Sequence, residues 1–137
     1  MLTGGGGVPL VVQTTPANVN DDQQLPALLD AAPAVRGPRG RPRRRLGCLF
    51  GDKMYGTRAQ VAGVRARGIF SFLSPRARAD HGSGLGVFRY VVERTLACFG
   101  HFRRLKMCYE RTHESFQALH EVAAACLVAT RLRRYEL

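Results

Sequence analysis

One carboxylate, Glu93, stands in an apolar and basic stretch that has the spacing of a helix. Cations accompany it on the same predicted helix: Arg89, Arg94, Arg103, Arg104 and Lys106. Carboxylate oxygens hold Mg²⁺ or Mn²⁺, and guanidinium groups bind phosphate oxygens in a planar fork. This combination is typical of an enzyme that cuts or joins nucleic acid strands with a bound metal ion.

A strand, a helix and a second strand are predicted in the middle of the chain. The apolar runs Leu46–Phe50 and Ile69–Leu73 predict the strands. Thr57 and Gln60 have the spacing of a capping box, in which each side chain bonds the other residue's backbone N–H. Gly68 predicts the end of the helix. A strand–helix–strand unit of this length favours parallel pairing of its strands.

A second carboxylate, Asp52, follows the first of these strands. This is the carboxyl end of the strand, where α/β sheets usually place ligands. Asp52 and Glu93 are therefore the candidate catalytic and metal-binding residues. Each also has an alternative without chemistry: Asp52 as a turn or cap residue, and Glu93 as the ion-pair partner of Arg89 one helical turn earlier.

The remaining elements are predicted from periodicity and cap residues. Val8–Thr15 predicts a strand after a glycine turn, and Gln23–Ala32 predicts a short helix. A helix is predicted over Val87–Leu105, and Thr112 is expected to cap a last helix. Apolar positions of the two long helices are expected to face the core: Val87, Tyr90, Val91, Cys98, Phe99, Phe102, Leu105, Phe116, Leu119, Ala123, Cys126, Leu127 and Thr130.

The charge of the chain favours nucleic acid as the partner. The formal net charge is +11, and no Lys or Arg precedes Arg36. The segment Arg36–Arg45 is rich in Gly and Pro, which disfavours helix and strand, so it predicts an exposed loop. Its arginines are candidate phosphate contacts: Arg36, Arg39, Arg41, Arg43, Arg44 and Arg45.

The cysteines Cys48, Cys98, Cys108 and Cys126 form no CxxC pair, and buried thiols in a reducing compartment are the expected reading. A zinc site from Cys98, His101, Cys108 and His113 is an alternative with poor spacing. No signal peptide and no apolar run of about 20 residues is present, which predicts a cytoplasmic protein without membrane contact.

The sequence around both carboxylates resembles a known family. LGCLFGDKMYGTRAQVAGVRARGI, residues 46–69, is similar to the second-aspartate region of DDE transposases of bacterial insertion sequences, in the IS-four/IS-five-like group. The run from Arg89 to Thr95 and the run from Phe102 to Leu105 resemble the region that carries the glutamate of that family. The resemblance extends over nearly the whole chain.

This resemblance implies a truncated RNase H-like fold, a mixed α/β architecture that lacks its first strand and most of its second. Asp52 matches the second aspartate and Glu93 the glutamate, while the first aspartate has no counterpart in the chain. Residues 1–35 are then a residual strand and short helix, residues 36–45 an arginine-rich loop, and residues 46–137 the C-terminal part of the catalytic domain.

By the same resemblance, the family performs Mg²⁺- or Mn²⁺-dependent DNA cleavage and strand transfer at insertion-sequence ends. Because one acid is absent, weak or no catalysis is expected from this chain alone. The alternative is a non-catalytic DNA-binding fragment that interferes with the intact transposase in a mixed complex or as a homo-oligomer. An inert remnant is the third reading.

Overall fold

The computed structural model describes residues 1–36, 39–42, 46–73 and 86–133 and has a mixed α/β architecture. The chain divides into two compact units. Unit 1 comprises residues 1–16 and 90–137, and unit 2 comprises residues 17–89. Each unit buries its own set of apolar side chains, so each is described by itself.

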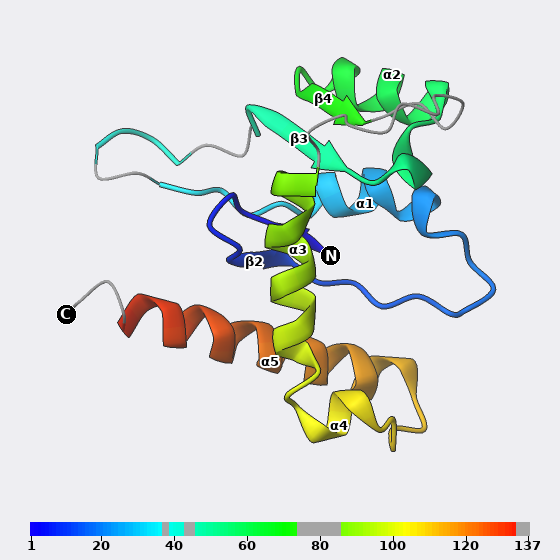
Figure 1. Cartoon of the computed structure of the whole chain (residues 1–137), viewed down its shortest axis with the longest axis vertical. Coiled ribbons are helices and arrows are strands. Elements are labelled where there is room, and N and C mark those ends of the chain that lie inside the picture. The colour runs from blue at the N-terminus through cyan, green and yellow to red at the C-terminus, as the bar shows by residue number, and fades with distance from the viewer. Residues whose placement is uncertain (37–38, 43–45, 74–85, 134–137) are drawn as a thin grey trace. The chain divides into compact units, whose positions relative to one another are not determined.

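Unit 2 contains the predicted strand–helix–strand segment. Strand β3 spans Cys48–Gly51, helix α2 spans Arg58–Ala66 and strand β4 spans Phe70–Leu73. The strands pair in parallel, with Cys48 opposite Phe70 and Gly51 opposite Leu73 (Figure 1). The predicted parallel pairing is therefore confirmed. One side of the pair carries the buried Leu49 and Leu73, as the alternation of side chains along a strand requires.

Both ends of α2 follow from its sequence. The Thr57 hydroxyl accepts a 3.3 Å hydrogen bond from the Gln60 backbone N–H, which confirms this half of the predicted capping box. At the other end Gly68 has φ 69°, and the Ile69 N–H reaches back 3.3 Å to the Val64 carbonyl. Val64 and Ile69 are both buried, so the turn after α2 also contributes to the core.

Helix α1 spans Leu25–Asp30 and follows the short 3₁₀ turn η1, Asp21–Gln24, which confirms a helix within the predicted range. Its buried leucines are Leu25, Leu28 and Leu29. The last residue of α1, Asp30, accepts two hydrogen bonds from Arg67: 2.9 Å from Nε and 2.8 Å from Nη2. This planar, two-bond pair ties the end of α1 to the end of α2.

The Asp30–Arg67 pair predicts a specific dependence of unit 2 stability on pH. The hydrogen bonds from Arg67 lower the pKa of the Asp30 carboxyl below its ordinary value. A lowered carboxyl pKa gives stabilisation that is present above the ordinary pKa of roughly 3.9 and is lost as the pH falls through the lowered value. Urea titrations at pH 7 and below pH 4 should therefore show that Asp30→Asn costs stability only at the higher pH.

Arg67→Gln should abolish this pH-dependent loss of stability, because it removes the partner of Asp30. Arg65→Gln, an exposed arginine in the last turn of α2, is the matched control and should keep the step. An unchanged pH profile in Arg67→Gln would show that the pair contributes nothing to folding.

Unit 1 begins with a small antiparallel hairpin. Strand β1 spans Leu2–Thr3 and β2 spans Pro9–Val11, joined by the glycine turn. The predicted strand Val8–Thr15 is therefore too long. After Val11 the backbone pairs with a side chain and not with another strand. The Gln117 side chain donates a 2.7 Å hydrogen bond to the Val12 carbonyl and accepts a 2.8 Å hydrogen bond from the Thr14 N–H.

The helix predicted over Val87–Leu105 is wrong in its length. Helix α3 spans Gly86–Phe99, and a separate turn of helix, α4, spans Arg103–Lys106 (Figure 1). At Gly100 the N–H bonds the Ala97 carbonyl three residues back, a tightening that ends the α-helix. The poor helix propensity of glycine explains why the break falls at this position.

Helix α5 spans His113–Arg133 and begins as predicted, since the Thr112 hydroxyl accepts a 3.2 Å bond from the Ser115 N–H. Its expected core stripe is only partly right: Ala123 is buried, but Cys126 and Thr130 are exposed. The apolar sides of these helices are set by packing as well as by period.

The expectation of buried thiols is also wrong. The free cysteines Cys48, Cys108 and Cys126 are exposed, and Cys98 is half-buried. Tyr90, predicted to face the core, is 57% exposed.

Thr95 joins α3 to the glycine turn of the hairpin. Its side chain is 1% exposed, and its hydroxyl donates a 2.7 Å hydrogen bond to the Gly7 carbonyl. Gly7 has φ 79°, and a Cβ there would lie 3.0 Å from the Thr95 hydroxyl oxygen, so a glycine is required at this close approach. Arg131 of α5 also donates to the neighbouring Gly6 carbonyl. Side chains from α3 and α5 thus both bond the glycine turn of the hairpin.

Thr95→Val is predicted to destabilise the chain by about 1–3 kcal/mol, because a buried carbonyl loses its donor. The measurement is the urea midpoint followed by far-UV circular dichroism. Thr130→Val is the matched control, since that exposed hydroxyl bonds only the Cys126 carbonyl of its own helix. Its cost should stay within about 0.5 kcal/mol. Equal losses in both variants would show that the Gly7 contact adds no stability.

Candidate functional site

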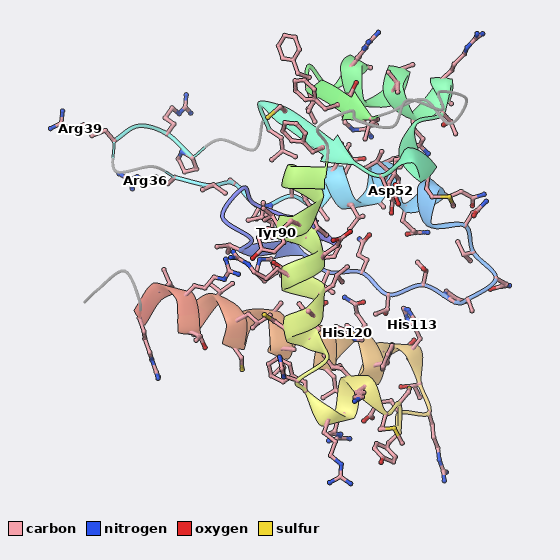
Figure 2. All side chains as sticks on the ribbon, in the orientation of Figure 1. Arg36, Arg39, Asp52, Tyr90, His113 and His120 are labelled. Atoms are coloured by element: carbon pink, nitrogen blue, oxygen red, sulfur yellow. The ribbon has the colours of Figure 1, made fainter. Side chains whose placement is uncertain are left out.

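Asp52 lies where the sequence predicts it, directly after β3. The 3₁₀ turn η2, Lys53–Tyr55, follows at once, and the Tyr55 N–H donates 3.0 Å to the Asp52 carbonyl. Asp52, labelled in Figure 2, is half-buried. A Cβ at Gly51 would lie 2.6 Å from Leu73 Cδ2, so the Leu73 side chain of β4 fills the space that a side chain at position 51 would need.

Glu93 lies in the middle of α3, and its side chain is exposed. Thr95 and Phe99, one turn apart, occupy the buried side of this helix. The helix therefore presents the carboxylate on a different face from the one that packs on the hairpin. The predicted ion pair with Arg89 concerns a side chain outside the described part of the structure.

The two candidate acids belong to different units, Asp52 to unit 2 and Glu93 to unit 1. Among the side chains that the structure describes, no group of three or more His, Cys, Asp or Glu residues could hold a metal ion. This finding removes the alternative zinc site of Cys98, His101, Cys108 and His113.

The arginine-rich segment is exposed wherever it is described, at Arg36, Arg39 and Arg41 (Figure 2 labels the first two). None of these belongs to a helix or strand, as the Gly and Pro content predicts. The candidate contacts Arg43, Arg44 and Arg45 lie outside the described residues. Exposed guanidinium groups on an extended segment are well suited to phosphate oxygens.

The basic side chains of unit 1 differ in their contacts with neighbouring residues. Arg94 is exposed and lies 5.5 Å from the centre of the Tyr90 ring, one turn away on α3. Arg104 forms an ion pair with Glu110, which offsets part of its charge. Arg103 and Lys106, on α4, are exposed.

Tyr90 is a candidate contact residue that sequence reasoning assigned to the core instead. An aromatic ring and an arginine four residues apart share one helix face, and this spacing is the signal that identifies the pair. An exposed ring beside a cation can stack on a base while the cation bonds phosphate.

Comparison with known proteins decides the family. The family described as Transposase DDE domain matches residues 1–83, more than half of the chain. The chain belongs to the DDE transposase family. The family resemblance predicted from the sequence is thereby confirmed, and the matched residues of this transposase segment include Asp52 and end before Glu93.

A curated relative of this DDE transposase segment covers Glu93 as well. The chain is 40% identical over 134 residues to the "Putative transposase for insertion sequence element IS402" of Burkholderia cepacia. The match includes 98% of the chain and 63% of the relative, so the chain spans less than two thirds of that protein's length. No solved structure matches this chain. None of the helices within the described ranges is long and apolar enough to cross a bilayer.

Proposed function

We propose that this chain is a catalytic-domain segment of a DDE transposase in which Asp52 and Glu93 are the second and third acids. The position of Asp52 at the carboxyl end of β3, in a parallel strand pair, carries the proposal. Family membership supports it, and so does a glutamate exposed on a later helix. The proposed arrangement is a truncated RNase H-like fold in which residues 1–35, 36–45 and 46–137 are parts of one domain.

Carboxylate oxygens at Asp52 and Glu93 fit Mg²⁺ or Mn²⁺, which prefer hard oxygen ligands. In such sites two metal ions supply an activated oxygen nucleophile and stabilise the leaving oxygen of the phosphodiester. Two carboxylates return only two negative charges against four positive ones. We therefore propose that these acids alone bind metal weakly, and that a third carboxylate from outside these 137 residues completes the site.

The cations hold the nucleic acid in this proposal. Exposed Arg36, Arg39 and Arg41 bind backbone phosphates next to the strand that leads to Asp52, and Arg43, Arg44 and Arg45 extend that segment. Arg89 and Arg94 flank Glu93 in sequence, while Arg103, Arg104 and Lys106 continue the basic surface. Insertion-sequence DNA ends are the proposed partner.

A non-catalytic role is the second candidate. The specific observation in its favour is the lack of a three-ligand group among the described side chains, alongside an exposed arginine segment. Such a chain would bind DNA, or join intact transposase, without cleaving strands. DNA affinity without nicking is the outcome that separates this role from the enzyme.

Iron-directed backbone cleavage tests whether Asp52 and Glu93 share a metal site. Fe²⁺ replaces Mg²⁺ or Mn²⁺, and ascorbate with peroxide then cuts the backbone beside the bound iron. Cuts are expected near both positions 52 and 93 in the full chain with duplex DNA present. Asp52→Asn should remove both sets of cuts, because the two acids hold the same ion.

Glu114→Gln, an exposed acid of α5, is the matched control and should leave the cuts unchanged. Cuts that surround only one of the two positions would contradict a shared site.

A further inference from the structure

Three exposed amide side chains surround a hollow in unit 2. The residues that line it are Ala17, Asn18, Val19, Asn20 and Gln23. The hollow has a volume of about 470 Å³, within the range of roughly 300–1,000 Å³ that small-molecule sites occupy. None of the three amide groups forms a hydrogen bond with another residue in the described part of the chain. Their donors and acceptors are therefore open to a ligand.

The local backbone places two of these amides together. The Gln23 N–H donates a 3.1 Å hydrogen bond to the Asn20 carbonyl at the start of η1. Residues three apart in a 3₁₀ turn lie on the same side, so the Asn20 and Gln23 side chains share one edge of the hollow. Each amide offers N–H donors and a carbonyl acceptor. The pair fits a planar ligand that presents a donor and an acceptor side by side.

The charge of this stretch disfavours phosphate as the ligand. None of the five lining residues is charged. The sequence of the adjoining turn contains Asp21 and Asp22, and no Lys or Arg precedes Arg36. Negative charge in this stretch repels phosphate oxygens and favours an amino group. The edge of a nucleobase matches this chemistry better than the backbone of a nucleic acid.

The hollow lies next to the candidate acid Asp52. Turn η1 contacts η2, the turn that directly follows Asp52, and both turns belong to unit 2. A DNA strand with a phosphate at Asp52 would bring its nearest bases to this part of unit 2. The hollow is thus placed to contact a base of the strand on which Asp52 acts.

We propose that Asn20 and Gln23 recognise an adenine base of the DNA strand held at Asp52, a specificity that rests on the proposed function. Adenine presents an N7 acceptor beside an N6 amino donor, and an Asn or Gln amide pairs with both atoms at once. Guanine and thymine have no amino group on that edge, and cytosine has no N7. Ala17 and Val19 supply apolar contacts to the ring. Because no lining residue is a cation, the phosphates of the strand bind elsewhere, at the arginine-rich segment.

Fluorescence anisotropy with short single-stranded DNA in EDTA tests the recognition without metal or cleavage. A thymine oligomer with one central adenine should bind the full chain about tenfold more tightly than the all-thymine oligomer. Replacing that adenine with 7-deazaadenine, which lacks N7, should remove most of the gain. Asn20→Ala combined with Gln23→Ala should bind both oligomers equally. The affinity of this variant for the all-thymine oligomer should match wild type, because its phosphate contacts are unchanged.

Gln24→Ala is the matched control. It removes a neighbouring amide of the same turn that does not line the hollow and that forms no side-chain cap hydrogen bond with α1. This variant should keep the tenfold preference for adenine. Far-UV circular dichroism should show wild-type helix content in every variant.

Photocrosslinking gives an independent location for the base. A thymine oligomer with one central 8-azidoadenine should crosslink within residues 17–23, as mapped by tandem mass spectrometry. Crosslinks confined to other parts of the chain would contradict the assignment.

Equal affinity of the wild-type chain for the two oligomers would overturn the recognition of adenine. A preference that survives the double substitution, or that Gln24→Ala also abolishes, would contradict a role for the hollow. Displacement of the adenine oligomer alone by free deoxyadenosine monophosphate would assign the hollow to a free nucleotide instead. Because these measurements omit metal, this proposal can fail while the shared metal site of Asp52 and Glu93 stands, and the reverse.

Discussion

Mn²⁺-dependent nicking of supercoiled plasmid DNA is expected to be at background for the 137-residue chain and to appear when the proposed third acid is supplied. The candidate source of that acid is the part of the Burkholderia cepacia relative that the chain does not span, and the test joins the chain to it. The joined protein should nick at least about 100-fold faster, since metal-bound charge stabilisation is worth several kcal/mol and each 1.4 kcal/mol is tenfold. The measurement is the rate of open-circle formation on agarose gels.

Substitutions in the joined protein identify the acids that act. Asp52→Asn and Glu93→Gln should each return nicking to background, because a metal ligand is lost while shape is kept. Glu114→Gln is the matched control and should keep nearly full activity at pH 7. Its carboxylate is exposed and does not belong to the proposed site.

Two outcomes would contradict this account. If the unjoined chain nicks DNA and Glu93→Gln abolishes that activity, then two acids suffice and the weak-site prediction is wrong. If the joined protein keeps its nicking activity after both substitutions, Asp52 and Glu93 are not the metal ligands.

Duplex DNA affinity should fall steeply with salt and depend on the arginine-rich segment. Replacing Arg36, Arg39 and Arg41 with Ala is expected to weaken binding by about 100-fold near 0.1 M salt. The slope of log K against log salt should become shallower by about 2–3, because each phosphate contact releases a counterion. Fluorescence anisotropy with a labelled duplex at several salt concentrations measures both quantities.

A second triple variant separates position from total charge. Arg58, Arg65 and Arg111 are exposed arginines outside the segment, and their replacement with Ala removes the same net charge. This variant should lose less than about tenfold in affinity and keep most of its salt slope. Equal losses in the two variants would show that DNA responds to net charge alone and that the segment has no special role.

The capped helix and its flanking strands could be predicted from sequence because their determinants are local. A threonine hydroxyl satisfies a free N–H three residues on, and a glycine accepts the positive φ at the end of α2. The short connection between two apolar runs then leaves parallel pairing as the favoured topology. The place of Asp52 at the carboxyl end of β3 follows from the same local signals.

The interruption after Phe99 and the exposure of Tyr90 were not predictable in the same way. The apolar pattern continues past Gly100, so period alone extends the helix to Leu105, whereas the structure ends α3 and starts α4. The helical period also predicts that Tyr90, Cys126 and Thr130 face the core, but all three are exposed in unit 1. A stripe shows that a face is apolar, but the neighbouring elements decide which side is covered.

The basic charge, the family and the two candidate acids follow from the amino-acid sequence, because charge and motif spacing are properties of the chain alone. The folded structure was needed to show that Thr95 and Arg131 bond the glycine turn and that Gln117 bonds the backbone beyond Val11. These contacts join residues about a hundred positions apart. A hydrogen bond between such distant groups has no local signal, since it forms only when packing brings the two segments together.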